Sequence, residues 1–461
     1  MTVTLAQKQQ ALGEGSVMKT LIRLSLPSMG MMFLNTFVFL VDSIFVSWLG
    51  EDCIAAMSLS LPIAIFYFAI MEGVVSGTTA LVGQNLGRGN SGLARMIAVS
   101  GLTFAYALCL FMTPLLLRGP SGWIFNNLGA RGDAAILGLT FRYNFWWTPT
   151  APLIAYTFIS NSVFRCQGDA MTPLKTMAIA NAVNIILDPI FIFTLGMGIE
   201  GAAVATMLSR VASSVYLYFK MKGLGGIFIP VIPNPRRAFL RHWTRIAAIG
   251  FPVTLSTGSM ALSFGWLNNI LAGFGNYAVV ALMMSLRIED FSFNIIVGVC
   301  ATLTPFLAYN YGRRDLGRML EGMKSAAIIA GVASLALGSV LFAFPRLFID
   351  LFRPTPEATE SAILSIRYSI SAYPLIVAQF VMNALFVATG YSVFGTVVQL
   401  VRSIIVRLPA AYIFASLYGI AGIWLFQPVS WVFSTLVAWI FFVRLVARIR
   451  REFQPGKIDV T

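Results

Sequence analysis

Histidine and cysteine are scarce in this 461-residue chain, and their scarcity excludes several kinds of chemistry. The single histidine, His242, lies in a basic stretch near the middle of the chain, so metal sites built on several histidines and Ser-His-Asp hydrolysis are excluded. The four cysteines show no paired spacing, which suggests neither a disulfide framework nor a zinc site. A phosphate-binding loop of the Walker type is also lacking. We therefore expect no enzyme activity, no bound metal and no cofactor.

Charged residues are also few. They make up 11% of the chain, against 58% hydrophobic residues, whereas about a quarter of a soluble domain is charged. Apolar segments of about 20 to 30 residues recur between short polar breaks, and each could cross a membrane as a helix. We predict an all-α integral membrane protein with twelve transmembrane helices in two pseudo-symmetric six-helix lobes. The predicted spans are 21–49, 54–86, 93–118, 135–164, 173–196, 201–222, 245–273, 277–310, 317–344, 358–388, 394–416 and 421–447.

The charges that are present follow the sides of a membrane. The formal net charge is +14, but Lys and Arg concentrate in alternate loops and in the C-terminal tail, which is typical of membrane topology and not of a nucleic-acid-binding patch. We expect both termini to be cytoplasmic, in a multi-pass protein of the cytoplasmic (inner) membrane. The expected parts are a cytoplasmic segment 1–20, an N-lobe 21–222, a cytoplasmic linker 223–244, a C-lobe 245–447 and a cytoplasmic tail 448–461.

An internal repeat supports the two-lobe prediction. Adding 225 to a residue number (252 − 27 = 225) converts Pro27 into Pro252, Gly50 into Gly275 and Asn85 into Asn310. The register holds for roughly sixty residues and resumes later with small deletions. The copies differ in their acids, because apolar residues of the second copy occupy the positions equivalent to Asp42 and Asp188 of the first. Two repeated bundles around a central cleft are typical of alternating access.

The two aspartates share a predicted depth. Asp42 lies eight residues before Gly50, and Asp188 lies eight residues before Gly196, which places both about 12 Å below the outer ends of their helices. Charges at membrane depth are costly and usually functional. We interpret the pair as a protonatable pocket, while two helix-ending acids wetted from outside remain the alternative.

Polar residues line one face of the helix that carries Asp188. Asn181, Asn184 and Asp188 follow at three- and four-residue spacing, so they share that face, and they predict a wet or polar-lined interior. Pro189 follows directly and removes a backbone donor. We expect Pro27 and Pro189 to bend their helices, and these two prolines and Asn181 to lie at the substrate cavity.

A charged group of the second copy consists of Arg287, Glu289 and Asp290. An internal pair of arginine and acid that neutralises itself could simply hold helices together. A role in gating or coupling is the other interpretation, and the sequence leaves both open.

The chain resembles the multidrug and toxic compound extrusion (MATE) family over almost its whole length. The resemblance is carried by Pro27 and Asp42, by the motif NLGRGN at 85–90, by FRCQGD at 164–169 and by NIILDP at 184–189. Within the family it looks like the prokaryotic DinF-like branch. That resemblance implies a proton site in the N-lobe, and its residues here are Asp42, Tyr143, Asn161, Asn184, Asp188 and Thr206.

The resemblance and the acids together lead to one main hypothesis. We expect a secondary active antiporter that exports amphiphilic, mostly cationic organic compounds in exchange for H⁺. Its partners would be small organic substrates and membrane lipid, with no nucleic acid, and we expect a monomer. Coupling to Na⁺ is one alternative, and a flippase for lipid-linked oligosaccharides, as in the related superfamily, is another.

Overall fold

The computed structural model describes residues 5–113, 134–223 and 237–454, and these ranges are helical apart from short connections. The N-lobe contains α2 (Val17–Ser47), α3 (Glu51–Gly87), α4 (Ser91–Met112), α6 (Ala134–Trp147), α7 (Thr150–Cys166), α8 (Met171–Pro189), the π-helical turn η3 (Ile190–Thr194) and α9 (Ile199–Gly223). A short helix, α1 (Leu5–Gly13), precedes it.

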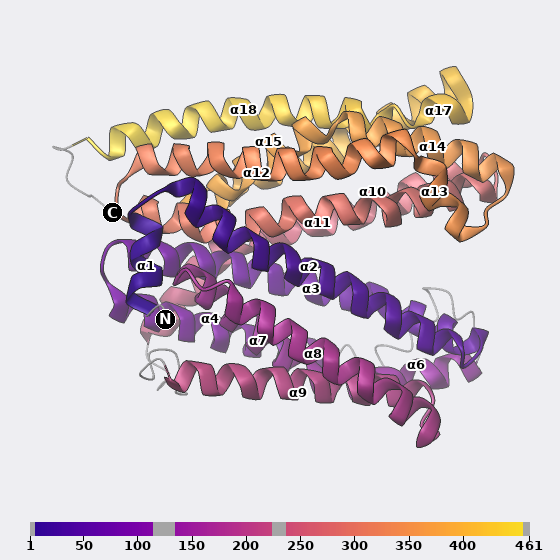
Figure 1. The fold of residues 1–461 in the computed structure, drawn as a ribbon, viewed down its shortest axis with the longest axis horizontal. Coiled ribbons are helices and arrows are strands. Elements are labelled where there is room, and N and C mark those ends of the chain that lie inside the picture. Colours follow the sequence, from indigo (N-terminus) through magenta and orange to yellow (C-terminus); the bar gives the residue numbers. More distant parts are fainter. Residues whose placement is uncertain (1–4, 114–133, 224–236, 455–461) are drawn as a thin grey trace.

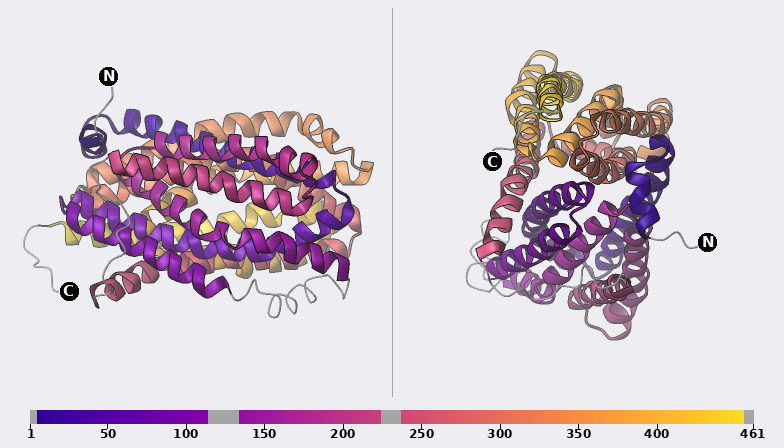
Figure 2. Two further views of the ribbon diagram at one scale, coloured as in Figure 1. Left: turned by 90° about the horizontal axis from the view of Figure 1, so that it is seen from below. Right: turned by 90° about the vertical axis from the view of Figure 1, so that its left-hand side faces the viewer.

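The C-lobe repeats this order of elements. It contains α10 (Arg237–Ala272), α11 (Asn276–Gly312), α12 (Leu316–Ala343), the short α13 (Pro345–Ile349) and η4 (Asp350–Phe352), α14 (Pro356–Ser371), α15 (Tyr373–Thr389), α16 (Ser392–Leu400), the π-helical turn η5 (Val401–Val406), α17 (Arg407–Ile423) and α18 (Phe426–Glu452). In Figure 1 the long helices run side by side, with the N-lobe below and the C-lobe above, and the end-on view in Figure 2 separates the two groups.

Ten of the described helices are long and apolar enough to cross a membrane, and the bent pair α14 and α15 raises this to eleven. The predicted span 135–164 falls on α6 and α7, which have 14 and 17 residues and are each too short alone. They are separated at Thr148 and Pro149. The predicted span 93–118 falls on α4, and its last residues lie outside the described ranges. The chain is a multi-pass membrane protein.

Two helices extend beyond the predicted spans. Helix α10 begins at Arg237, inside the segment that we expected to be a linker, and the rest of that linker, residues 224–236, lies outside the described residues. Helix α18 continues to Glu452, inside the predicted tail. Polar and basic residues can continue a helix beyond the apolar core of a membrane, so hydropathy alone places the start of α10 too late and the end of α18 too early.

The backbone reproduces the internal repeat in detail. Helices α3 and α11 both have 37 residues. They follow Gly50 and Gly275, whose φ angles are 112° and 114°. After these helices, Asn90 and Asp315 (315 − 90 = 225) cap α4 and α12 by accepting a hydrogen bond from the backbone N–H three residues on. The copies therefore share backbone geometry, including a conformation that favours glycine.

The lobes pack closely near α1, at the end of the bundle that also holds the last turns of α3 and α11, which we call the α1 end (Figure 1). There a Cβ atom added to Gly87 would overlap the carbonyl of Tyr309, and one added to Gly312 would overlap the carbonyl of Gln84. The side chain of Gln84 also donates to the carbonyl of Ala388, at 2.8 Å. Glycines allow this close approach of two helices.

Helix α1 ties the start of the chain to the C-lobe. The Arg318 guanidinium of α12 donates to four backbone carbonyls at the end of α1, those of Ala11, Leu12, Glu14 and Gly15, at 2.8 to 3.2 Å. Asn310 of α11 donates to the carbonyl of Leu12 as well, at 3.1 Å. These bonds satisfy carbonyls that the last turn of a helix leaves free.

Candidate coupling site in the N-lobe

The two predicted acids lie on neighbouring helices. Asp42 is on α2 and Asp188 is on α8, and these two helices pack against each other. The carboxylates are close enough for their charges to interact, and the hydroxyl of Tyr143 on α6 interacts electrostatically with both. The structure therefore brings together Asp42, Tyr143 and Asp188, three of the residues that the family resemblance implies.

The environment of the two carboxylates is buried and poor in donors. The Asp188 side chain is 0% exposed, and its Oδ1 accepts a hydrogen bond from Asn184 Nδ2 at 3.1 Å. Asp188 Oδ2 and Asp42 Oδ1 are buried and have no hydrogen-bond partner among the described residues. Across those residues, neither acid forms an ion pair with a basic side chain. A buried carboxyl oxygen without a partner is costly unless a proton or cation occupies it.

The other predicted site residues have different contacts in the described part of the chain. Asn181 is buried and donates from Nδ2 to the carbonyl of Leu34 at 2.6 Å, which joins α8 to α2. Asn161 Oδ1 is buried without a partner. Among the described residues no hydrogen bond or charge interaction joins Asn161 or Thr206 to either aspartate.

The two prolines differ in their effect on the backbone. Helix α2 is continuous through Pro27. Pro189 ends the regular part of α8, and the π-helical turn η3 follows at once. A π-helical turn inside a span widens the backbone and is frequent at functional sites, and here it lies next to Asp188.

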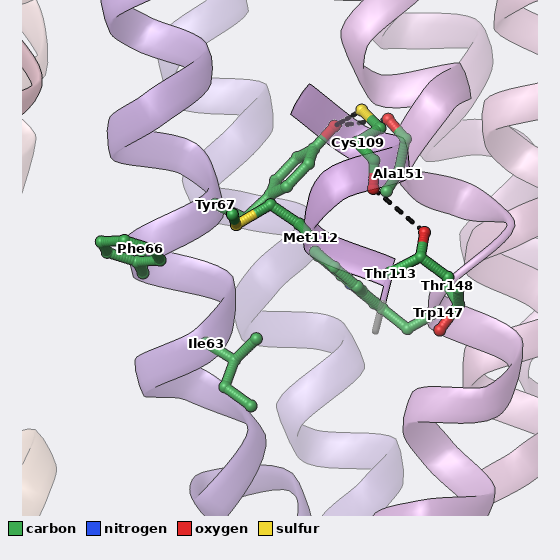
Figure 3. Close-up of a pocket in the computed structure, with 9 residues that line it drawn as sticks. All are labelled: Ile63, Phe66, Tyr67, Cys109, Met112, Thr113, Trp147, Thr148 and Ala151. Carbon is green, nitrogen blue, oxygen red and sulfur yellow. Dashed lines mark hydrogen bonds between the residues drawn. The ribbon is translucent and has the colours of Figure 1, made fainter. Parts of the chain in front are cut away.

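Two small pockets lie beside this site in the N-lobe. One is lined by Met57, Ser60, Leu61, Ile63, Ala64, Tyr143, Asn144 and Trp147. The second, drawn in Figure 3, shares Ile63 and Trp147 with it and is lined also by Tyr67 and Cys109. The Tyr67 hydroxyl donates to the carbonyl of Ala151, and its ring meets Trp147 edge to face with centroids 5.3 Å apart. The wall next to Tyr143 is therefore mostly apolar and aromatic.

The charged group of the C-lobe does not form an internal ion pair. Arg287 is exposed, and its guanidinium lies 5.7 Å from the ring of Phe39 on α2. Glu289 accepts a hydrogen bond from Ser369 Oγ, and its Oε1 is buried without a partner. Asp290 interacts with Arg287 only through charge at longer range. Among the described residues none of the three forms a salt bridge within 4.0 Å.

Sequence reasoning gave too little weight to two arginines of the eleventh span. Arg402 and Arg407 are both buried, and both lie over aromatic rings inside the C-lobe. The signal was present in the sequence, because two arginines five residues apart (407 − 402 = 5) interrupt an otherwise apolar helix.

Comparison with known proteins identifies the family. The profile of the MatE family matches residues 27–190 and, a second time, residues 252–413. The chain belongs to the MATE family. The two matches start 225 residues apart (252 − 27 = 225), at the prolines that begin the internal repeat.

The relatives of this MATE-family chain are transporters. The multidrug export protein MepA of Staphylococcus aureus (strain NCTC 8325 / PS 47) is 28% identical over 414 residues, which are 88% of this chain and 89% of that protein. The FAD transporter of Shewanella oneidensis is 26% identical over 423 residues, 89% of this chain and 91% of that protein. A solved multidrug resistance MATE family transporter of the MOP superfamily, described as outward-facing, superposes with a TM-score of 0.89 at 25% identity, over 98% of this chain and 100% of that one. The family resemblance and the predicted twelve-helix fold are confirmed.

Proposed function

We propose that this MATE-family chain exports amphiphilic, mostly cationic organic compounds in exchange for protons, by alternating access between its two lobes. The observation that carries the proposal is the pair Asp42 and Asp188. Their carboxyl groups interact within the N-lobe, each has a buried oxygen without a hydrogen-bond partner, and neither is neutralised by a basic side chain of the described residues.

The chemistry of antiport follows from competition for this pair. A protonated carboxyl group is neutral and does not attract a cation, whereas an ionised one does. Proton and cationic substrate then disfavour each other's binding, either at the same group or through the conformation of the lobe.

The proposal includes an orientation in the membrane. The basic loops favour a cytoplasmic location for both termini in the inner membrane, which places the α1 end on the cytoplasmic side. Close packing of the lobes at that end and the similarity to a structure described as outward-facing both support a conformation that is open to the outside. A monomer is sufficient for this arrangement, because both lobes come from one chain.

The test is gradient-driven efflux from proteoliposomes with a cationic dye. Asp42→Asn and Asp188→Asn should each abolish efflux driven by a pH gradient, because asparagine cannot exchange a proton. Asp52→Asn is the matched control, since Asp52 is an exposed acid of the same lobe, and it should retain efflux. Full activity of both site variants would refute the proposal.

The same preparation tests the ion. Replacing the pH gradient by a Na⁺ gradient at constant pH should leave the dye inside the vesicles. Efflux with Na⁺ alone, lost in the Asp188→Asn variant, would instead assign the coupling to Na⁺, for which carboxylate and amide oxygens are acceptable ligands.

A further inference from the structure

The two lobes differ in the sign of the charge that they bury. With the later offset of the repeat (419 − 198 = 221), Arg402 of the C-lobe takes the place of Asn181 in the N-lobe, and Arg407 takes the place of Ile186. The helix that supplies an acid to the N-lobe thus supplies two arginines to the C-lobe. Arg407 lies 15 residues after Ser392, where α16 begins, and 12 residues before Gly419, where the backbone of α17 leaves helical geometry (419 − 407 = 12). At a rise of about 1.5 Å per residue it sits near the middle of the membrane.

Arg407 is a buried cation with a hydrogen-bond donor that no described residue satisfies. It is 6% exposed, and its guanidinium carbon lies 4.4 Å from the ring centroid of Phe264 on α10 and 5.1 Å from that of Phe426 on α18. Its Nη1 is buried without a hydrogen-bond partner among the described residues. The rings hold the guanidinium plane in place but accept none of its in-plane hydrogen bonds.

Arg402 is bound by neutral groups only. It is also 6% exposed, and its guanidinium lies 4.0 Å from the ring centroid of Trp431. Its acceptors are Gln399 Oε1, at 3.0 and 3.3 Å, and the sulfur of Met260, at 3.7 Å. The positive charges of Arg402 and Arg407 are close enough to repel each other.

One acid of the described residues interacts with Arg407, and it does not pair with it. Glu289 on α11 interacts with Arg407 through charge but forms no hydrogen bond or salt bridge with it among the described residues. Its carboxylate instead accepts from Ser369, and its other oxygen is buried without a partner. Two guanidinium groups and one carboxylate leave an excess positive charge in the interior of the C-lobe.

Buried cations without a counterion are costly, and they persist where a ligand supplies the counter-charge. Arginine presents parallel N–H donors that match carboxylate and phosphate oxygens. The turn that carries Arg402 and leads into Arg407 is the π-helical turn η5, a type of distortion that is common at functional sites. Phe264, Phe426 and Trp431 add aromatic surface next to these donors.

We propose that Arg402 and Arg407 form a second substrate subsite, which binds the carboxylate, phosphate or sulfonate group of an aromatic anion or zwitterion in the C-lobe. The proposal rests on the proposed export function and extends its substrates beyond cations. A zwitterion could place its cationic part toward the N-lobe acids and its anionic part on these arginines.

The test is equilibrium binding of two flavins to the purified full-length chain, followed by flavin fluorescence. Riboflavin and riboflavin 5′-phosphate share one aromatic ring system and differ by a phosphate group. The phosphate form should bind at least about tenfold more tightly, as expected for charge-assisted hydrogen bonds to arginine. In Arg407→Gln this preference should fall to within about twofold, and Arg407→Lys should keep part of it because the charge remains without the planar fork.

Arg367→Gln is the matched control, because Arg367 also lies over a phenylalanine of the C-lobe, 5.6 Å from the ring of Phe342, but is exposed. It should keep the full preference. A second pair of probes, 1-naphthoate and 1-naphthylmethanol, repeats the comparison with a carboxylate. Equal binding of the charged and neutral members of both pairs, or an unchanged preference in Arg402→Gln and Arg407→Gln variants that remain folded by thermal melting, would overturn the proposal.

Two further measurements locate the source of the anion and separate the two proposals. Displacement of the bound flavin by a short-chain anionic phospholipid would indicate a lipid headgroup as ligand, and displacement by inorganic phosphate but not by the lipid would indicate a soluble one; both outcomes support an anion site. Efflux of the cationic dye should persist in Arg367→Gln. Loss of efflux in Asp42→Asn together with no anion preference in the unmodified chain would refute the second subsite alone.

Discussion

At the candidate site, the sequence predicts how deep a residue lies in the membrane better than it predicts the direction in which its side chain points. Eight-residue spacing from Gly50 and Gly196 predicts one level for Asp42 and Asp188, because every residue of a helix advances by the same rise. In the structure the two carboxylates are close enough for their charges to interact. The direction in which Arg407 points depends on the packing of α10, α17 and α18, which no local pattern encodes. Its position over Phe264 and Phe426 therefore appears only in the structure.

At this scale we predict that Asn181 stabilises the pairing of the two acid-bearing helices. Asn181→Ala removes the 2.6 Å hydrogen bond to the carbonyl of Leu34 and should cost about 1 kcal/mol of stability. Thermal melting in detergent should show a decrease of about 2 °C for a chain of this size.

Asn161→Ala is the control for that measurement. The Asn161 oxygen has no partner among the described residues, so its removal should change the melting temperature less. Equal decreases for both variants would show that loss of the amide itself, and not the bond between α8 and α2, determines the effect.

Regular elements were predictable where apolar length and repetition agree, and less so where the helices are interrupted. The repeat predicted two matching halves, and α3 and α11 match in length and in both caps. The break at Thr148 and Pro149, and the π-helical turns η3 and η5, were not predicted in this form. A proline indicates that a helix can be interrupted, but packing decides whether it is. Helix α2 continues through Pro27, whereas α8 gives way to the π-helical turn η3 after Pro189.

At the scale of elements we predict equal costs for equivalent glycines of the two copies. Gly50 and Gly275 precede α3 and α11 with φ of 112° and 114° and ψ of 170° and 164°, a region that is essentially restricted to glycine. Gly50→Ala and Gly275→Ala should each destabilise the protein by about 1 to 3 kcal/mol, measured by thermal or denaturant unfolding.

Gly138→Ala provides the contrast in the same experiment. Gly138 lies within α6 and a Cβ atom there would meet nothing within 4 Å, so alanine should be neutral or stabilising by up to about 1 kcal/mol. If Gly50→Ala were as stable as Gly138→Ala, the strained backbone would not set the position of the α3 start.

Considered as a whole, the molecule keeps its two candidate sites apart from the contacts at the α1 end. The acids lie within the N-lobe and the arginines within the C-lobe, whereas the α1 end is joined by glycines, by Gln84 and by the bonds of Arg318 to α1. Other charged residues do contact the opposite lobe, because Glu72 of α3 accepts a hydrogen bond from Thr257 of α10 and Arg287 of α11 lies over Phe39 of α2. A transporter that alternates must break some of these contacts in each cycle, so their strength sets the population of its states.

This separation leads to a prediction for the lobe contact itself. Gly312→Val places a branched side chain against the backbone of Gln84 and should force the α1 end apart without altering either charged site. Spin labels on the exposed positions Arg95 and Glu321, near the starts of α4 and α12, should then report a longer distance, and gradient-driven efflux should fall although Asp42 and Asp188 are intact. Gly331→Val, where an added Cβ atom would meet nothing within 4 Å, should change neither measurement. The labels measure closure of the α1 end. If Gly312→Val lost efflux but kept the normal label distance, Gly312 would not act through closure of this end.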